Sequence, residues 1–280
     1  MICLVNINFK VEEMMKLTKF TIAITVLSFF VLFTNAFAGD DYKFDPKSPY
    51  HTLYVPEGKG PFPAILLLHA SGGVAKVNHD WAQRLKEHGY VVFVIDSFKP
   101  RGWVDRASVG WEKATAAQLS DIAPAYRYLM HLPNVNPDKI GLLGFSMGGF
   151  DVLSAMQIPT ATPADYQLLP FKAAASFYGV CHRLPDDTKL KGPTKLFIGS
   201  DDDRATTDDC TKLVARSGGE IKQITMHIYQ NALHGFDNFE FPESKEIIDE
   251  KGERYHIGYN ESAREESLKD LPAFFDKYLR

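Results

Sequence analysis

The sequence predicts an α/β fold with a mostly parallel central sheet and helices on both of its faces. The first observation is a series of short apolar runs without polar alternation, which is typical of strands buried on both faces of a parallel sheet. The second is that helical segments lie between these runs, and such alternation indicates βαβ units with right-handed crossovers. The third is length, because 280 residues with 45% hydrophobic side chains can bury a core as one domain.

The elements follow one another in a regular order. Continuous apolar strands are predicted at residues 64–68, 91–95, 140–143, 173–177 and 196–198, with an edge strand around 52–55 and an alternating strand at 221–229. Helices are predicted at 80–88, 114–132, 148–157, 207–216 and 262–279. Asn260 suits the N-cap of the last helix. Residues 240–259 are polar and charged, and we expect them to form a long excursion, as a hairpin that lines the mouth of a site.

The N-terminus has the organisation of a secretory signal peptide. Lys16 and Lys19 precede an apolar run at 20–33, which leads into Ala36-Phe37-Ala38. Cleavage is predicted after Ala38. The alternative is a retained membrane anchor, but the run is shorter than the roughly 20 apolar residues that a spanning helix needs. We therefore expect an exported protein, periplasmic or secreted, without a stable membrane anchor.

This assignment divides the chain into an N-terminal extension with signal peptide, 1–38, and one folded domain, 39–280. The residues before Met14 fit a signal peptide poorly, so the predicted translation start is Met14 or Met15. No composition shift after residue 39 indicates a second domain.

The predicted mature chain holds two cysteines, Cys181 and Cys210. An even number in an exported protein predicts one disulfide. The alternative is two separate buried thiols.

Charge and motif content exclude several classes of function. The net charge is −4 and no run of lysine and arginine occurs, so we expect no nucleic-acid partner. The sequence has no H-E-x-x-H, no paired C-x-x-C and no G-x-G-x-x-G. We therefore predict neither a metal nor an organic cofactor, and the sequence indicates no oligomeric state.

The strongest chemical signal is Gly144-Phe145-Ser146-Met147-Gly148, a G-x-S-x-G sequence between a predicted strand and a predicted helix. In the α/β-hydrolase fold this pattern is a sharp turn that exposes a nucleophilic serine, and its glycines prevent backbone clashes. The turn also places the N–H of Met147 at a helix start, which favours negative charge. Ser146 is thus the predicted nucleophile, rather than part of a glycine-rich structural turn.

A serine hydroxyl needs a base, and on this fold an acid and then a histidine follow the serine along the chain. The predicted strand at 196–198 leads into Ser200-Asp201-Asp202-Asp203. Ligand-facing residues of such sheets lie just beyond the carboxyl ends of strands. We favour Asp202, because the loop needs a residue or two to turn, and expect Asp201 and Asp203 to be solvated. The alternative is that all three are surface acids.

The predicted base is His234, which follows the strand at 221–229 in a loop. Of the nine histidines, only His234 follows the acid at a suitable spacing. The second oxyanion donor is expected in the turn His69-Ala70-Ser71-Gly72-Gly73, after the strand at 64–68. We predict that the backbone N–H of Ser71 is this donor, with the N–H of Ala70 as the alternative. The segment could also be an ordinary strand-to-helix turn without a role in catalysis.

Several segments together resemble the dienelactone hydrolase family. They are His69 to Gly73, Asp96 to Gly102, Gly144 to Gly149, Gly199 to Asp203, His234-Gly235-Phe236-Asp237 and His256 to Asn260. The resemblance spans nearly the whole predicted mature chain. It implies an α/β-hydrolase fold and a Ser146–His234–Asp202 triad, and it supports Asp202 over its neighbours. It also implies a substrate-binding role for Arg101 as a bidentate clamp on a carboxylate, with a structural ion pair to a neighbouring acid as the alternative.

The sequence departs from the family pattern at three places. The dienelactone hydrolase after which the family is named has a cysteine nucleophile at the position of Ser146 and a glutamate at the position of Ala70. It is also expected to have a second arginine where this sequence has Asn238. The carboxylate-binding pair is therefore incomplete, and we expect a substrate other than dienelactone.

The expected function is hydrolysis of a small carboxylic ester or lactone through an acyl-enzyme. Two alternatives remain: a peptidase or amidase with the same triad, and a non-catalytic exported binding protein that kept the fold.

Overall fold

The computed structural model describes residues 42–159, 162–241, 244–249 and 251–280. The predicted signal peptide and translation start lie outside these residues. Residues 44–280 form one compact unit. No helix in the described part of the chain is long and apolar enough to cross a membrane.

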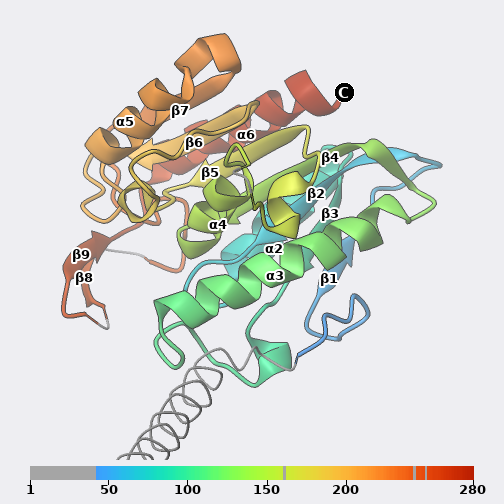
Figure 1. The fold of residues 1–280 in the computed structure, drawn as a ribbon, viewed down its shortest axis with the longest axis horizontal. Helices are drawn as coiled ribbons and strands as arrows, with labels where there is room; N and C mark the ends of the chain where they lie inside the picture. The colour runs from blue at the N-terminus through green and yellow to red at the C-terminus, as the bar shows by residue number, and fades with distance from the viewer. Residues whose placement is uncertain (1–41, 160–161, 242–243, 250) are drawn as a thin grey trace, which may run out of the picture. The chain divides into compact units, whose positions relative to one another are not determined.

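The described residues contain a seven-stranded sheet in the order β1-β3-β2-β4-β5-β6-β7 (Figure 1). The strands are β1 (Thr52–Tyr54), β2 (Phe62–Leu68), β3 (Val91–Ile95), β4 (Val135–Phe145), β5 (Ala173–Phe177), β6 (Thr194–Gly199) and β7 (Ile224–Tyr229). Only the edge strand β1 is antiparallel to its neighbour; the other neighbouring pairs are parallel. The mostly parallel sheet is confirmed.

Helices cover both faces of the sheet, as predicted. They are α2 (Lys76–Glu87), α3 (Trp111–Met130), α4 (Met147–Ala155), α5 (Thr207–Ser217) and α6 (Glu261–Leu279). Side chains alternate along β2: Leu66 packs in one apolar cluster with α3, α4 and α5, and Leu67 packs in another with α2 and α6. This alternation explains why the strand is apolar at every position.

Some boundaries differ from the predictions. Helix α2 begins four residues earlier than predicted, at Lys76, and the Asn78 side chain accepts a hydrogen bond from the Ala75 N–H at this end. Strand β7 begins three residues later, because Gly219–Lys222 forms a 3-10 turn instead. The predicted Asn260 cap is confirmed, since its side chain accepts a hydrogen bond from the Ala263 N–H.

The expected excursion after the last strand is a two-stranded hairpin of β8 (Lys245–Ile248) and β9 (Arg254–Ile257). Figure 1 shows this hairpin projecting from the body of the sheet. Its last strand is tied to the loop after β7 by a bridge between Ile257 and His234 and by a hydrogen bond from the Gly258 N–H to the His234 carbonyl, 3.1 Å.

Candidate active site

The candidate site lies at the carboxyl ends of the parallel strands. The chain runs from β2 to β3 on one side and returns to place β4 on the other, so the sheet order reverses between β2 and β4. Leu68 at the end of β2 pairs with Gly144 near the end of β4. The 69–73 turn and Ser146 therefore meet at a topological switch point, where open α/β sheets bind their ligands.

Ser146 lies on a strained turn between β4 and α4. Its backbone has φ 53° and ψ −109°, a conformation that is costly for a residue other than glycine. The Ser146 N–H donates to the Phe177 carbonyl of β5 at 2.9 Å, which helps to hold the turn. This geometry lifts the serine side chain above the end of the sheet.

The flanking glycines are needed for close approach of backbone to backbone. A Cβ at position 144 would lie 2.2 Å from the Gly148 carbonyl oxygen, and one at position 148 would lie 2.6 Å from the His69 carbonyl oxygen. Any side chain at these positions would push α4 away from β2 and β4. The G-x-S-x-G pattern is thus explained by sterics at this turn.

Three side chains distant in sequence come together here. The Ser146 hydroxyl Oγ lies 2.8 Å from His234 Nε2. His234 Nδ1 lies 3.0 Å from Asp202 Oδ2 and 3.2 Å from Asp202 Oδ1. The side chains of His234 and Asp202 are 6% and 0% exposed, so the pair is shielded from competing water.

Only one of the three consecutive acids faces the histidine. Asp202 Oδ1 also accepts hydrogen bonds from the backbone N–H groups of Arg204 and Ala205, at 2.9 and 2.7 Å, which fix its orientation. Asp201 is exposed and accepts from the Ser200 hydroxyl. Asp203 is exposed, but it is not merely solvated as predicted, because it also pairs with His256 of β9.

The two predicted oxyanion donors flank Ser146. Met147 is the first residue of α4, and the first N–H groups of a helix have no acceptor within the helix. Ser71 and Ala70 both line the cavity above Ser146. The turn that holds them is closed by a hydrogen bond from the Gly73 N–H to the Ala70 carbonyl.

The sequence analysis missed a buried group that packs behind the histidine. The Tyr178 ring lies 4.8 Å from the His234 ring, and its hydroxyl donates to Asp237 Oδ1 at 2.6 Å. Trp81 Nε1 donates to the other oxygen, Asp237 Oδ2, also at 2.6 Å. Burial raises the pKa of Asp237, and the two hydrogen bonds act against that rise. Burial next to Asp237 also raises the pKa of Tyr178 well above the ordinary value.

A signal for this group was present in the sequence. Asp237 belongs to the His234-Gly235-Phe236-Asp237 segment, and Tyr178 follows directly after β5, where functional side chains are expected. Nothing in the sequence pairs the two, because 59 residues separate them.

A cavity of about 430 Å³ opens above Ser146. Its walls come from the 69–73 turn, the start of α2, the loop after His234 and the β8–β9 hairpin. The hairpin contributes Ile247, Tyr255 and Ile257, as expected for an element at the site mouth. Glu240 and Phe241 also line the cavity.

Arg101 forms a buried ion pair with an acid, which was the structural alternative to binding substrate. Its guanidinium donates to both carboxylate oxygens of Asp121 at 2.8 Å and to the Ser97 carbonyl at 2.9 Å. Its side chain is 2% exposed, and Arg101 is not among the residues that line the cavity. A buried guanidinium that is satisfied by its own carboxylate has no free donor pair for a ligand, and this corrects the predicted clamp on a substrate carboxylate.

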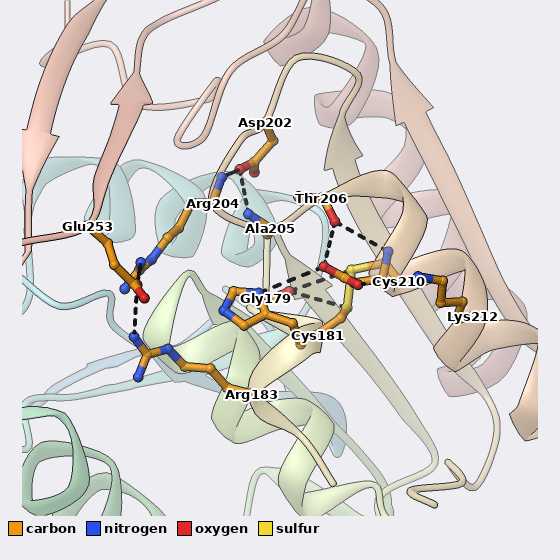
Figure 2. Close-up of polar contacts among 12 residues, drawn as sticks. Gly179, Cys181, Arg183, Asp202, Arg204, Ala205, Thr206, Cys210, Lys212 and Glu253 are labelled. Atoms are coloured by element: carbon orange, nitrogen blue, oxygen red, sulfur yellow. Dashed lines mark hydrogen bonds and ion pairs between the residues drawn. A yellow bond between two sulfur atoms is a disulfide. The ribbon is translucent and has the colours of Figure 1, made fainter. Parts of the chain in front are cut away.

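The predicted disulfide between Cys181 and Cys210 is present, with sulfur atoms 2.04 Å apart. It joins the short helix η4 (Cys181–Arg183) to α5, which begins shortly after Asp202 (Figure 2). Figure 2 also shows Arg183 and Arg204 both pairing with Glu253, at 3.7 and 2.8 Å. The segment that bears Asp202 is therefore tied to the disulfide on one side and to the hairpin on the other.

One group of potential metal ligands occurs among the described residues, and it lies outside the cavity. His227, Glu266 and Asp270 bring ligand atoms within 4.8 Å of one another. Both ring nitrogens of His227 already pair with carboxylates, at 2.8 and 3.0 Å, and Lys195 lies 3.7 Å from Asp270. The His227 ring and the two carboxylates thus already contact one another and Lys195.

Comparison with known proteins gives a family match over most of the chain. The profile of the Dienelactone hydrolase family matches residues 51–279. A candidate carboxymethylenebutenolidase of Synechocystis sp. is 25% identical over 205 residues, which are 66% of this chain and 79% of that protein.

Solved structures share the fold. The dienelactone hydrolase of Anabaena variabilis superposes with a TM-score of 0.58 at 19% identity, covering 82% of this chain and 92% of that one. A thermophilic esterase of Thermogutta terrifontis gives a TM-score of 0.59 at 18% identity, covering 81% of this chain and 88% of that one.

Proposed function

This chain belongs to the dienelactone hydrolase family and is a hydrolase of the α/β-hydrolase fold, and from that premise we propose that it cleaves a carboxylic ester or lactone with a Ser146–His234–Asp202 triad. The observation that carries the proposal is the 2.8 Å contact between Ser146 Oγ and His234 Nε2, at a strained turn beneath a cavity. A nucleophile, a base within hydrogen-bond reach and a third group that orients the base are the geometric signature of covalent catalysis.

In the acylation half, Ser146 Oγ attacks the carbonyl carbon while His234 Nε2 takes the hydroxyl proton. Asp202 accepts a hydrogen bond from the Nδ1–H of His234 and stays ionised, which holds the ring in the useful tautomer and stabilises the imidazolium. The tetrahedral intermediate then expels the alcohol, and His234 gives its proton to the leaving oxygen. The products of this half are a free alcohol and an ester on Ser146.

In the second half, water attacks the acyl-enzyme and His234 again removes the proton. Collapse returns the proton to Ser146 Oγ and releases the acid. The oxyanion of both halves is proposed to accept hydrogen bonds from the Met147 N–H and from the N–H of Ser71. Two such preorganised donors lower the barrier by several kcal/mol, because they are aimed where charge develops.

The test is a set of variants with two independent measurements. Ser146→Ala and His234→Ala are expected to lower turnover of p-nitrophenyl esters or lactones by about three orders of magnitude or more. A fluorophosphonate reagent is expected to label the wild type and not Ser146→Ala. Ser154→Ala, a serine on the same helix that does not line the cavity, is the matched control and should retain both signals.

Turnover of amides decides between the esterase and a peptidase on the same triad. We expect p-nitroanilides to react far more slowly than the matching esters. A folded wild type that neither reacts with the reagent nor turns over any ester would contradict the proposed function.

Export is part of the proposal. Disulfides persist in oxidising compartments and are rare in the cytosol, and the Cys181–Cys210 bond is compatible with a periplasmic or secreted enzyme. The predicted cleavage after Ala38 would be tested by N-terminal mass analysis of the exported protein.

A further inference from the structure

We propose that the cavity selects uncharged esters and rejects substrates that carry a carboxylate, with Glu240 as the residue that sets this preference; the inference rests on the proposed function of the site. Neither the triad nor the family match defines this class of substrate.

The described residues of the cavity walls include no cationic partner for a carboxylate. The described residues that line it include Val77, Phe145, Phe241, Ile247 and Ile257, and no lysine or arginine. Apart from His234 of the triad, Glu240 is the one titratable acid or base among them besides tyrosine hydroxyls. A carboxylate that enters such walls loses its hydration without gaining a charge-assisted hydrogen bond, and this disfavours its binding.

Three arginines near the site have buried side chains that pair with carboxylates. Arg204 donates to Asp249 at 2.7 Å and to Glu253 at 2.8 Å. Arg264 pairs with Asp80 at 2.5 Å and lies 93% buried. Together with the Arg101–Asp121 pair, this means that an anionic substrate would have to compete with a protein carboxylate for each of these three guanidinium groups. Drawing one of them away would strand its carboxylate partner, so binding of an anion would be opposed twice.

Glu240 adds a negative field at the cavity. Its backbone N–H donates to the Asn238 side chain at 3.0 Å, which helps to hold this segment. The carboxylate side chain is 32% exposed and lies 3.7 Å from the Lys76 ammonium, which is 80% exposed and does not line the cavity. An exposed ion pair of this kind is well screened and only partly offsets the carboxylate. A negative group at the cavity repels anionic substrates and attracts cationic ones.

The proposed role of Glu240 can be tested with substrates of different charge, because a negative field acts in opposite directions on anionic and cationic esters. Three p-nitrophenyl esters of similar acyl-chain length and different terminal charge are compared: mono-p-nitrophenyl adipate, its methyl ester, and p-nitrophenyl 6-(trimethylammonio)hexanoate. With wild type, kcat/KM for the methyl ester is expected to exceed that for the free monoacid by at least about 30-fold, because the acid is desolvated without a partner.

Glu240→Gln is expected to shift the charged substrates in opposite directions. Relative to the methyl ester, kcat/KM for the monoacid should rise and that for the cationic ester should fall, each by about three- to tenfold. A merely structural role would move all three substrates together. Glu220→Gln makes the same charge change at an exposed position that does not line the cavity, and it should leave all three ratios as they are.

The outcomes separate this inference from the proposed function. A wild type that reacts with the neutral fluorophosphonate reagent but prefers the monoacid overturns the inference and leaves the triad intact. Ratios that do not move in opposite directions in Glu240→Gln overturn the role of Glu240. Absence of both labelling and ester turnover would instead overturn the proposed function.

Discussion

Replacement of Gly148 by alanine tests whether close packing at the serine turn is required for catalysis. The added Cβ would lie 2.6 Å from the His69 carbonyl oxygen and 2.7 Å from that of Leu68. These backbone atoms end β2 and lead into the turn that carries Ser71. Relief to an ordinary contact of 3.4 Å requires a separation of about 0.8 Å between α4 and that turn.

Both the stability and the activity should respond. Overpacking of this size lowers the free energy of unfolding by about 1–3 kcal/mol, and the better helix propensity of alanine offsets up to about 1 kcal/mol of that loss. A displacement near 1 Å between two oxyanion donors costs about 100-fold in kcat/KM, because the donors no longer converge on one oxygen. The variant is therefore expected to fold, with a large loss of activity in its folded fraction.

The control is Gly141→Ala on β4. Its Cβ would meet the side-chain ends of Leu279 and Phe275 at 3.0 Å, on α6 and away from the serine turn. Urea unfolding and p-nitrophenyl ester kinetics on both variants separate the two effects. Gly141→Ala should lose stability and keep its kcat/KM. If Gly148→Ala kept activity within about threefold of wild type while folded, the steric argument for this turn would be wrong.

Three further predictions concern stability. Replacing Cys181 and Cys210 together by alanine should lower the free energy of unfolding by about 3–4 kcal/mol, because the bond spans 29 residues; a loss under about 1 kcal/mol in urea would contradict this. Tyr178→Phe should cost about 1–3 kcal/mol, since buried Asp237 loses a donor, and an unchanged urea midpoint would refute it. The carboxyl of Asp151 is fully buried and accepts no hydrogen bond from the described residues, and burial raises its pKa well above 3.8. Because the carboxyl pKa is raised in the folded state, wild type loses stability as pH rises from 3.8 to that raised native pKa. Asp151→Asn should therefore gain on wild type by about 1.4 kcal/mol per pH unit between these two pKa values; a pH-independent difference between the two unfolding curves would exclude it.

Most of the fold was predictable because its signals are local. A strand buried on both faces has to be apolar at every position, and this is visible in residues 64–68 and 91–95 without any knowledge of their neighbours. Boundaries were less predictable, because they depend on caps and turns. The start of α2 is an example, since the Asn78 side chain that bonds the Ala75 N–H gives no periodic signal.

Within the candidate site, the sequence identified the triad residues but not the contacts that orient them or that occupy their neighbours. The choice of Asp202 over Asp203 was an argument about loop length, and the structure shows the reason: Asp202 points inward because two backbone N–H groups of its own loop hold it, while Asp203 faces β9. The partner of Arg101 lies 20 residues away on α3. Such contacts depend on how elements pack, which periodicity along the chain does not encode.

The sequence by itself therefore determined the parallel sheet and the strand–turn–helix around Ser146, because buried apolar runs and the close approach of Gly144 to Gly148 involve residues that are near one another along the chain. The order of acid and histidine followed from the pattern of the fold. Three features were decided by the tertiary structure alone. Arg101 pairs with Asp121, the Tyr178–Asp237 pair packs next to His234, and Glu240 lines the cavity. The physical reason is that charge pairing and cavity walls are set by distances through space between segments that the chain separates widely.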